Sequence, residues 1–214
     1  MPKKTFLNLE EKKKESIMRS AVNEFSERGF EKANVGNIAK NANISKGSIY
    51  QYFNNKKELF FFSVKWSTDF IGKKYGNYFI SDNKDINIFD LFYKNSKSLW
   101  VQMREERKLI IFVQDVFLGK YKNLTDESMS YMMDILNEYT LKLIQNGKKN
   151  GSIRKDIDDN MLSIFITAVS MGFKEHMMRN SRKKGRDIVD EDFEINEKEI
   201  KSMIELLKNG MGEK

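Results

Sequence analysis

The residues at 44–53, ISKGSIYQYF, bring together several side chains that can recognise another molecule. Ser, Tyr and Gln supply hydrogen-bond donors and acceptors, and Gly47 lets a backbone be approached closely. The amide of Gln51 can form paired hydrogen bonds with an adenine edge. A helix with a purely structural role more usually exposes Glu and Lys at such positions. The segment therefore indicates a surface that contacts nucleic acid, although two short core helices with incidental polar residues are the alternative.

The flanking residues predict how this segment is held. Asn34 can cap a helix over 35–42, and Ser45 can cap a second helix over 46–53. Asn43, between them, tolerates the positive φ that a tight turn needs. Two short helices joined in this way form a helix-turn-helix, in which the second helix enters the major groove. The inward residues of the unit are Ile38, Ala39, Ala42, Ile44 and Ile49, followed by Tyr52 or Phe53.

The rest of the chain is periodic at helical spacing. A first helix is predicted over 9–29, where Gly29 would end it and Phe30 would pack beneath it. Asn55 can cap a continuous helix from Lys56 to about Tyr78. The charged segment 181–194 is predicted to be an exposed loop. Further helices are predicted over 87–104, 106–119, 126–149, 158–180 and 195–210.

Composition narrows the class of protein. The single proline is Pro2, so nothing in the remaining chain interrupts long helices, and the fold class is predicted to be all-α. The chain has no cysteine and one histidine, His176, which removes thiolate zinc sites and most catalytic arrangements of the hydrolases. We therefore expect no enzyme, no metal and no cofactor. No apolar run is long enough to cross a membrane, and the N-terminus lacks the apolar centre of a secretion signal, so a cytoplasmic protein without a membrane partner is expected.

The net charge of +7 is concentrated in the first part of the chain. Residues 1–60 hold 12 Lys or Arg and 7 Glu, an excess of +5, whereas residues 61–214 hold an excess of only +2. A basic segment favours a polyanionic partner because neutralising phosphates releases condensed counterions. A merely soluble surface is the alternative on charge alone.

The run NVGNIAKNANISKGSIYQYFNNKKELF resembles the DNA-binding segment of the TetR family of bacterial regulators, in which the pattern T-x-x-x-IA-x-x-A-G-V-S-x-G-x-[LI]-Y-x-[YH]-F-x-[SN]-K-x-x-L recurs. The likeness covers about residues 10–60. The chain has Asn34 where the family most often has Thr, and Asn can also cap a helix. It has Asn43 where the family most often has Gly, and Asn also tolerates a positive φ. The resemblance implies a helix-turn-helix domain at 1–54 and a helical ligand-binding and dimerisation domain at 55–214.

Eight residues are predicted to contact DNA. Base edges are assigned to Lys46, Ser48 and Gln51, and Gly47 permits close approach of the backbone. Phosphates are assigned to Asn34, Tyr50, Tyr52 and Lys56. One of the two tyrosines is alternatively a core residue, and Tyr52 fits that role better. The predicted DNA contacts are Asn34, Lys46, Gly47, Ser48, Tyr50, Gln51, Tyr52 and Lys56.

Aromatic and Met side chains at helical spacing are candidates for a ligand cavity, which the family resemblance implies between the middle helices. The alternative for each of them is an ordinary packing role. The candidates are Phe89, Phe92, Tyr93, Trp100, Met103, Phe112, Phe117, Tyr131, Tyr139 and Phe173.

Apolar stripes on the last two predicted helices exceed what one small core needs, and a symmetric four-helix interface between two copies would account for them. Interior helices of a large monomer are the alternative. The predicted interface residues are Met161, Phe165, Val169, Phe173, Met177, Ile200, Met203, Ile204 and Leu207.

These features predict a sequence-specific DNA-binding regulator. The expected form is a homodimeric repressor that holds a near-palindromic double-stranded operator and is released by a hydrophobic or amphipathic small-molecule inducer. Activation instead of repression stays open, because that depends on where the operator lies. A helical small-molecule-binding protein with an incidental basic N-terminus and a nonspecific nucleoid-associated protein are the rival interpretations.

Overall fold

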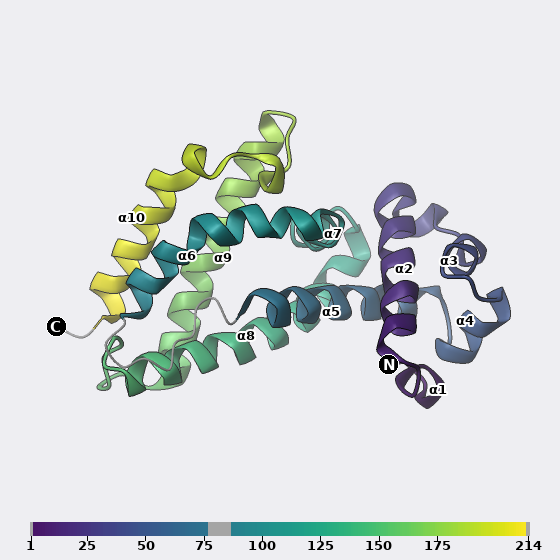
Figure 1. Cartoon of the computed structure of the whole chain (residues 1–214), viewed down its shortest axis with the longest axis horizontal. Coiled ribbons are helices and arrows are strands. Elements are labelled where there is room, and N and C mark those ends of the chain that lie inside the picture. Colours follow the sequence, from purple (N-terminus) through teal and green to yellow (C-terminus); the bar gives the residue numbers. More distant parts are fainter. Residues whose placement is uncertain (1, 77–86, 213–214) are drawn as a thin grey trace. The chain divides into compact units, whose positions relative to one another are not determined.

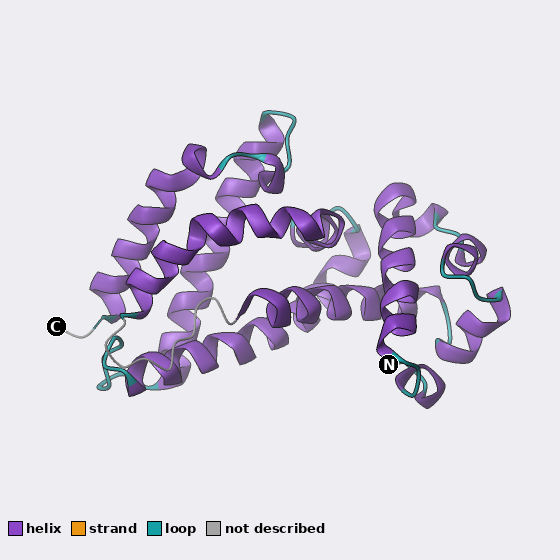
Figure 2. Cartoon of the chain, viewed as in Figure 1, coloured by secondary structure: helices purple, strands orange, loops and turns teal. Residues whose placement is uncertain are grey.

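Long helices dominate the chain, as expected from a sequence whose proline lies at its N-terminus. The computed structural model describes residues 2–76 and 87–212, and its regular elements over these ranges are helical, without a strand (Figures 1 and 2). The prediction of an all-α fold is confirmed. None of the described helices is both long and apolar enough to cross a membrane.

The helices follow the predicted order. The α-helices are α1 (Lys4–Leu7), α2 (Glu11–Lys32), α3 (Val35–Asn41), α4 (Lys46–Tyr52), α5 (Lys56–Tyr75), α6 (Ile88–Met103), α7 (Arg107–Phe117), α8 (Thr125–Lys149), α9 (Asp159–Lys183) and α10 (Phe193–Met211). Short 3-10 turns lie at η2 (Arg104–Glu106), η3 (Lys122–Leu124) and η4 (Ile188–Asp190).

Most predicted boundaries agree with these helices to within a few residues. Gly29 has φ 69° and ψ 169°, so the backbone leaves the helical conformation there, although hydrogen bonding continues to Lys32. The predicted end of the fifth helix at Tyr78 lies outside the described residues. Helix α1 was not predicted, because four residues are too few to show a helical period.

The chain forms two compact units. The first comprises residues 1–70 and 108–133, and the second comprises residues 71–107 and 134–214. In the first unit, Phe60 lies among aromatic rings, with centroid distances of 5.1 Å to Phe25, 5.8 Å to Phe112 and 4.9 Å to Tyr121. Edge-on and tilted ring contacts of this kind add to the stabilisation that apolar burial provides.

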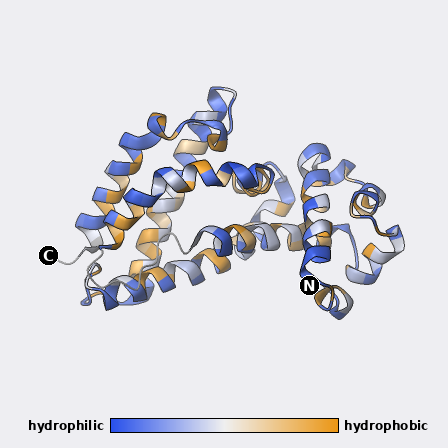
Figure 3. Ribbon diagram, viewed as in Figure 1, coloured by the Kyte–Doolittle hydropathy of each residue, from blue (hydrophilic) through white to orange (hydrophobic). Residues whose placement is uncertain are grey.

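The second unit has a separate core, to which α6, α8, α9 and α10 contribute. Its buried residues include Phe89 on α6, Ile144 on α8, Ile166 on α9 and Ile204 on α10. Polar and apolar residues alternate along α10, which is the pattern of a helix that buries one face (Figure 3).

The prediction that 181–194 is an exposed loop is wrong in part. Val189 and Glu191 are buried, and α9 and α10 both extend into the segment. The indole N–H of Trp100 donates to the Glu191 carbonyl at 2.8 Å, and the Arg104 guanidinium donates to the carbonyls of Val189 and Glu191 at 3.2 and 2.7 Å. Backbone carbonyls of the segment are thus hydrogen-bonded within the protein. The many charged residues of the segment had indicated exposure to solvent instead.

Candidate nucleic-acid interface

Helix α3 begins at a cap that is tied to α2. The Asn34 side chain accepts a hydrogen bond of 2.7 Å from the Gly36 N–H, which confirms the predicted cap. Glu24 of α2 is buried, and its carboxylate accepts from the Asn34 N–H at 2.9 Å and from the Asn37 amide at 3.2 Å. The role of Glu24 was missed, because the sequence does not show that this carboxylate faces inward.

The turn between α3 and α4 has the predicted geometry. Asn43 adopts φ 55°, and the Ile44 N–H donates back to the Ala39 carbonyl at 3.0 Å. Ser45 then caps α4, because its hydroxyl accepts from the Ser48 N–H at 3.0 Å. The two helices are therefore held as a helix-turn-helix, and the predictions at Asn43 and Ser45 are confirmed.

Helix α4 has one buried and one exposed face. Ile49 is buried and anchors the helix to the core. Four residues of the helix are exposed, namely Lys46, Gly47, Tyr50 and Gln51. Tyr50 is the aromatic residue among them and is 44% exposed. The exposed face thus carries a cation, an amide, a phenol and an uncovered stretch of backbone, which is suited to hydrogen bonding with base edges and phosphates.

Besides Asn34, three predicted DNA contacts have side-chain partners within the chain. The hydroxyls of Ser48 and Ser45 lie 2.9 Å apart, and Tyr52 is 8% exposed with its ring edge-on to Phe6. The Lys56 ammonium donates to the carbonyl of Glu31 at 3.0 Å, and it lies 4.8 Å from the centre of the Phe30 ring. Tyr52 therefore has the alternative role of a core residue, and the Lys56 ammonium binds a backbone carbonyl at the end of α2.

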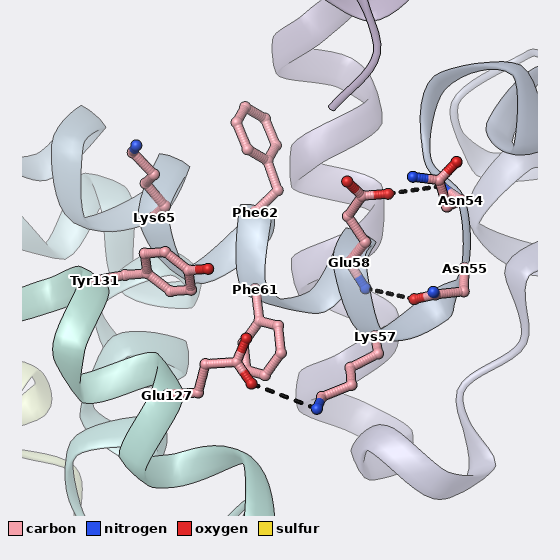
Figure 4. A pocket seen from close by; sticks show the side chains of 9 residues that line it. All are labelled: Asn54, Asn55, Lys57, Glu58, Phe61, Phe62, Lys65, Glu127 and Tyr131. Atoms are coloured by element: carbon pink, nitrogen blue, oxygen red, sulfur yellow. Dashed lines mark hydrogen bonds and ion pairs between the residues drawn. The ribbon is translucent and has the colours of Figure 1, made fainter. Parts of the chain in front are cut away.

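A pocket of about 310 Å³ lies in the first unit, beside the start of α5 (Figure 4). Lys57 forms an ion pair of 3.3 Å with Glu127 there, and the Glu58 N–H donates to the Asn55 side chain at 2.8 Å. The charges at its rim are balanced, so they favour neither a cation nor an anion. Its lining residues are Asn54, Asn55, Lys57, Glu58, Phe61, Phe62, Lys65, Glu127 and Tyr131.

Tyr131 is the one predicted ligand residue that lines this pocket. Phe112 is buried in the first unit and Phe89 in the second. Tyr93 donates its hydroxyl to Glu197 at 2.9 Å, and Trp100 packs against the core of the second unit. Phe92 and Phe173 also pack there, Met103 and Phe117 are half-buried, and Tyr139 lies against Gly72 and Gly76. Packing thus accounts for most of this set, and a ligand role for any member stays a prediction.

The predicted interface residues divide by exposure. Met177, Ile200, Met203, Ile204 and Leu207 are buried within the second unit, and Val169 and Phe173 pack against the same core. Met161 and Phe165 are exposed.

Large apolar residues outside the predicted set are also exposed on these two helices, among them Ile164 on α9 at 63% and Leu206 on α10 at 69%. The Phe165 ring lies near Gly210 of α10, where an added Cβ would stand 3.2 Å from it. The exposed apolar face therefore draws on both helices. Its most exposed members, Ile164 and Leu206, were not predicted. When a helix has apolar residues on two faces, sequence periodicity does not show which face is covered.

Together, the helix-turn-helix and the helical second unit define a DNA-binding regulator of transcription. Residues 17–61 match the bacterial regulatory proteins of the tetR family. Over 143 residues the chain is 28% identical to IcaR of Staphylococcus aureus, the negative transcriptional regulator of the biofilm operon icaADBC, across 64% of this chain and 75% of IcaR.

Two solved structures share the fold. A putative TetR-family regulator from Mesorhizobium loti superposes with a TM-score of 0.71 at 16% identity, covering 94% of this chain and 98% of that one. FadR from Bacillus subtilis, solved in complex with stearoyl-CoA, gives a TM-score of 0.55 at 20% identity, covering 92% and 98%. The matched segment 17–61 and the likeness to IcaR support a TetR-family regulator of transcription, and the solved structures show that the fold is shared.

Proposed function

We propose that two copies of the chain bind a near-palindromic operator and repress transcription until a small apolar or amphipathic molecule releases them. The single observation that carries this proposal is the exposed face of α4. Gly47, Tyr50 and Gln51 lie there uncovered, on a helix that Ile49 anchors from the other side. Repression is favoured by the likeness to IcaR, a negative regulator.

The residues of the motif take different roles in this proposal. Lys46, Ser48 and Gln51 contact base edges, and Gly47 permits close approach of the backbone. Asn34 and Tyr50 contact phosphates, which set the register without reading the sequence. Lys56 is a phosphate contact only if its ammonium leaves the carbonyls that it binds in the free chain, and Tyr52 serves the core.

Dimerisation is assigned to the apolar face of α9 and α10. Met161, Ile164, Phe165 and Leu206 form it, and an exposed patch of large apolar residues on paired helices is typical of a subunit interface. A two-fold axis through this face pairs α9 and α10 with their copies as four helices. Two α4 helices about 34–36 Å apart would then fit successive major grooves.

Ligand release is assigned to the helical region beyond the motif, so that residues 1–54 bind DNA and residues 55–214 bind ligand and partner. FadR, which shares the fold of this chain, was solved in complex with stearoyl-CoA. That complex supports an acyl chain or a similarly apolar group as the ligand class. Coupling between ligand and operator must be reciprocal, so operator DNA lowers ligand affinity by the same factor. A regulator of this kind acts in the cytoplasm.

Selection of bound duplexes from a random pool tests the proposal. We expect an enriched motif with two inverted half-sites, and binding to it that survives about 0.2 M salt while binding to random DNA does not. A nonspecific nucleoid protein would give no motif. A small-molecule-binding protein with an incidental basic N-terminus would not retard the duplexes at all.

A further inference from the structure

The last turn of α4 ends in backbone carbonyls that the helix itself does not satisfy. The final four carbonyls of any α-helix lack intrahelical partners. In α4 these belong to Ile49, Tyr50, Gln51 and Tyr52. The Ile49 carbonyl accepts the Phe53 N–H at 2.8 Å, which leaves the next three in need of donors.

Two residues before α2 supply all three donors. The Lys3 N–H donates to the Tyr52 carbonyl at 2.9 Å, and the Lys3 ammonium donates to the Tyr50 carbonyl at 2.9 Å. The Thr5 hydroxyl donates to the Gln51 carbonyl at 2.7 Å. The ammonium also places a positive charge at the C-terminal end of α4, where the helix dipole is negative.

An apolar anchor holds this short segment in place. Phe6, on α1, is only 1% exposed. Its ring centroid lies 5.8 Å from that of Tyr52, 5.0 Å from that of Phe53 and 5.4 Å from that of Phe62. The segment therefore packs against both the end of α4 and α5. This packing holds Lys3 and Thr5 in position for their hydrogen bonds to α4.

We propose that residues 2–8, the N-terminal brace, hold the last turn of α4 in the conformation that reads DNA. A helix of seven residues is too short to be stable alone, so outside contacts decide the order of its final turn. Gln51 lies in that turn, and the brace binds its carbonyl. Lys3 and Thr5 are thus positioning residues for operator recognition, and the inference rests on the proposed function of α4.

A pair of variants of the full chain separates the positioning of α4 by Lys3 from the general effect of losing one positive charge. Lys3→Met removes the ammonium that binds the Tyr50 carbonyl. Lys4→Met removes the same charge from an exposed neighbour whose ammonium has no hydrogen bond in the described part of the chain. The readout is the affinity for a duplex selected by the unmodified protein, divided by the affinity for a random duplex.

We expect Lys3→Met to lower this ratio about fivefold and Lys4→Met to leave it unchanged, because a lost phosphate contact weakens both duplexes alike. An equal ratio in the two variants would overturn the brace, whether both stay at the unmodified value or both fall.

Thr5→Val tests the brace at constant charge and nearly constant shape. It removes the donor to the Gln51 carbonyl, so we expect the ratio to fall about threefold and the amides of the last turn of α4 to exchange hydrogen faster without DNA, while those of α2 keep their protection. Unchanged exchange in α4 would refute the inference. Failure of the unmodified protein to select any duplex would count against the proposed function instead, because the exchange measurement needs no DNA.

Discussion

The Glu24 carboxylate of α2 accepts a hydrogen bond of 2.9 Å from the backbone N–H of Asn34, the residue that caps α3. Glu24 is buried, and α2 uses it together with Ser20, whose hydroxyl donates to the Ile38 carbonyl at 2.8 Å. These two contacts tie the helix-turn-helix to the helix behind it, one at the cap of α3 and one in the middle of that helix.

Glu24→Ala should therefore destabilise the protein. The change leaves the Asn34 N–H without its acceptor, which costs about 1–3 kcal/mol and lowers the Tm by several degrees in a chain of this size. Glu27→Ala is the matched control, because Glu27 lies exposed on the same helix and its loss changes the net charge equally. Equal Tm values for the two variants in calorimetry would show that the Glu24 contact contributes nothing.

Gly47→Ala should separate folding from DNA binding. A Cβ at position 47 would meet only the Ser45 hydroxyl, at the ordinary distance of 3.6 Å, and alanine favours a helix over glycine by about 1 kcal/mol. We expect an unchanged or higher Tm together with weaker operator binding, since the added methyl group blocks close approach of the backbone. Undiminished affinity in an anisotropy titration would remove Gly47 from the interface.

Leu206→Glu and Ile164→Glu should each break the proposed dimer. Both residues are exposed in the single chain, so the folded subunit tolerates a carboxylate there. In the dimer the same carboxylate would be buried without a partner at a cost of several kcal/mol, which raises the dissociation constant by roughly 100-fold or more.

Val101→Glu, at another exposed apolar position on α6, is the control for the dimer variants. Sedimentation should show monomers for the first two variants and dimers for the control. Dimers in all three samples would rule out the α9 and α10 face as the interface.

Asp190→Asn should flatten the acid dependence of stability. The guanidinium of Arg107 binds both Asp190 oxygens at 2.6 Å and lowers the pKa of that carboxyl. A carboxyl with a lowered pKa stabilises the fold above its unfolded pKa of about 3.9, and this contribution is lost as the pH falls through the folded pKa.

The Asn variant should thus lose less stability than the unmodified protein between about pH 5 and pH 2. Asp134→Asn, at an exposed position on α8, is the comparison. Parallel unfolding curves for all three proteins across that range would show that the Arg107 contact does not contribute.

Local chemistry explains why the motif could be predicted from sequence. Capping by Asn34 and Ser45 and the positive φ of Asn43 depend on neighbouring backbone groups only, so residue type and spacing suffice. The same holds for the long helices, whose period is a local property. Both kinds of prediction are confirmed to within a few residues.

Long-range contacts account for what the sequence did not reveal. Glu24 and Lys3 bind backbone groups at sequence separations of 10 and 47 residues, and nothing in their own neighbourhoods marks them for that role. The apolar helices at the C-terminus posed a similar problem, because both faces of α9 are apolar. Only packing shows that Met177 is covered while Ile164 is not.

The reading role of α4 is tested most directly at Gln51, whose side chain lies exposed on that helix. Duplex selection should be repeated with Gln51→Ala and compared with the motif of the unmodified protein. We predict that preference is relaxed at one base pair in each half-site, at a cost of about 1–3 kcal/mol on the original operator, with the other positions unchanged. An identical motif, with selected and random duplexes weakened alike, would contradict the assignment of α4 as the helix that reads the operator.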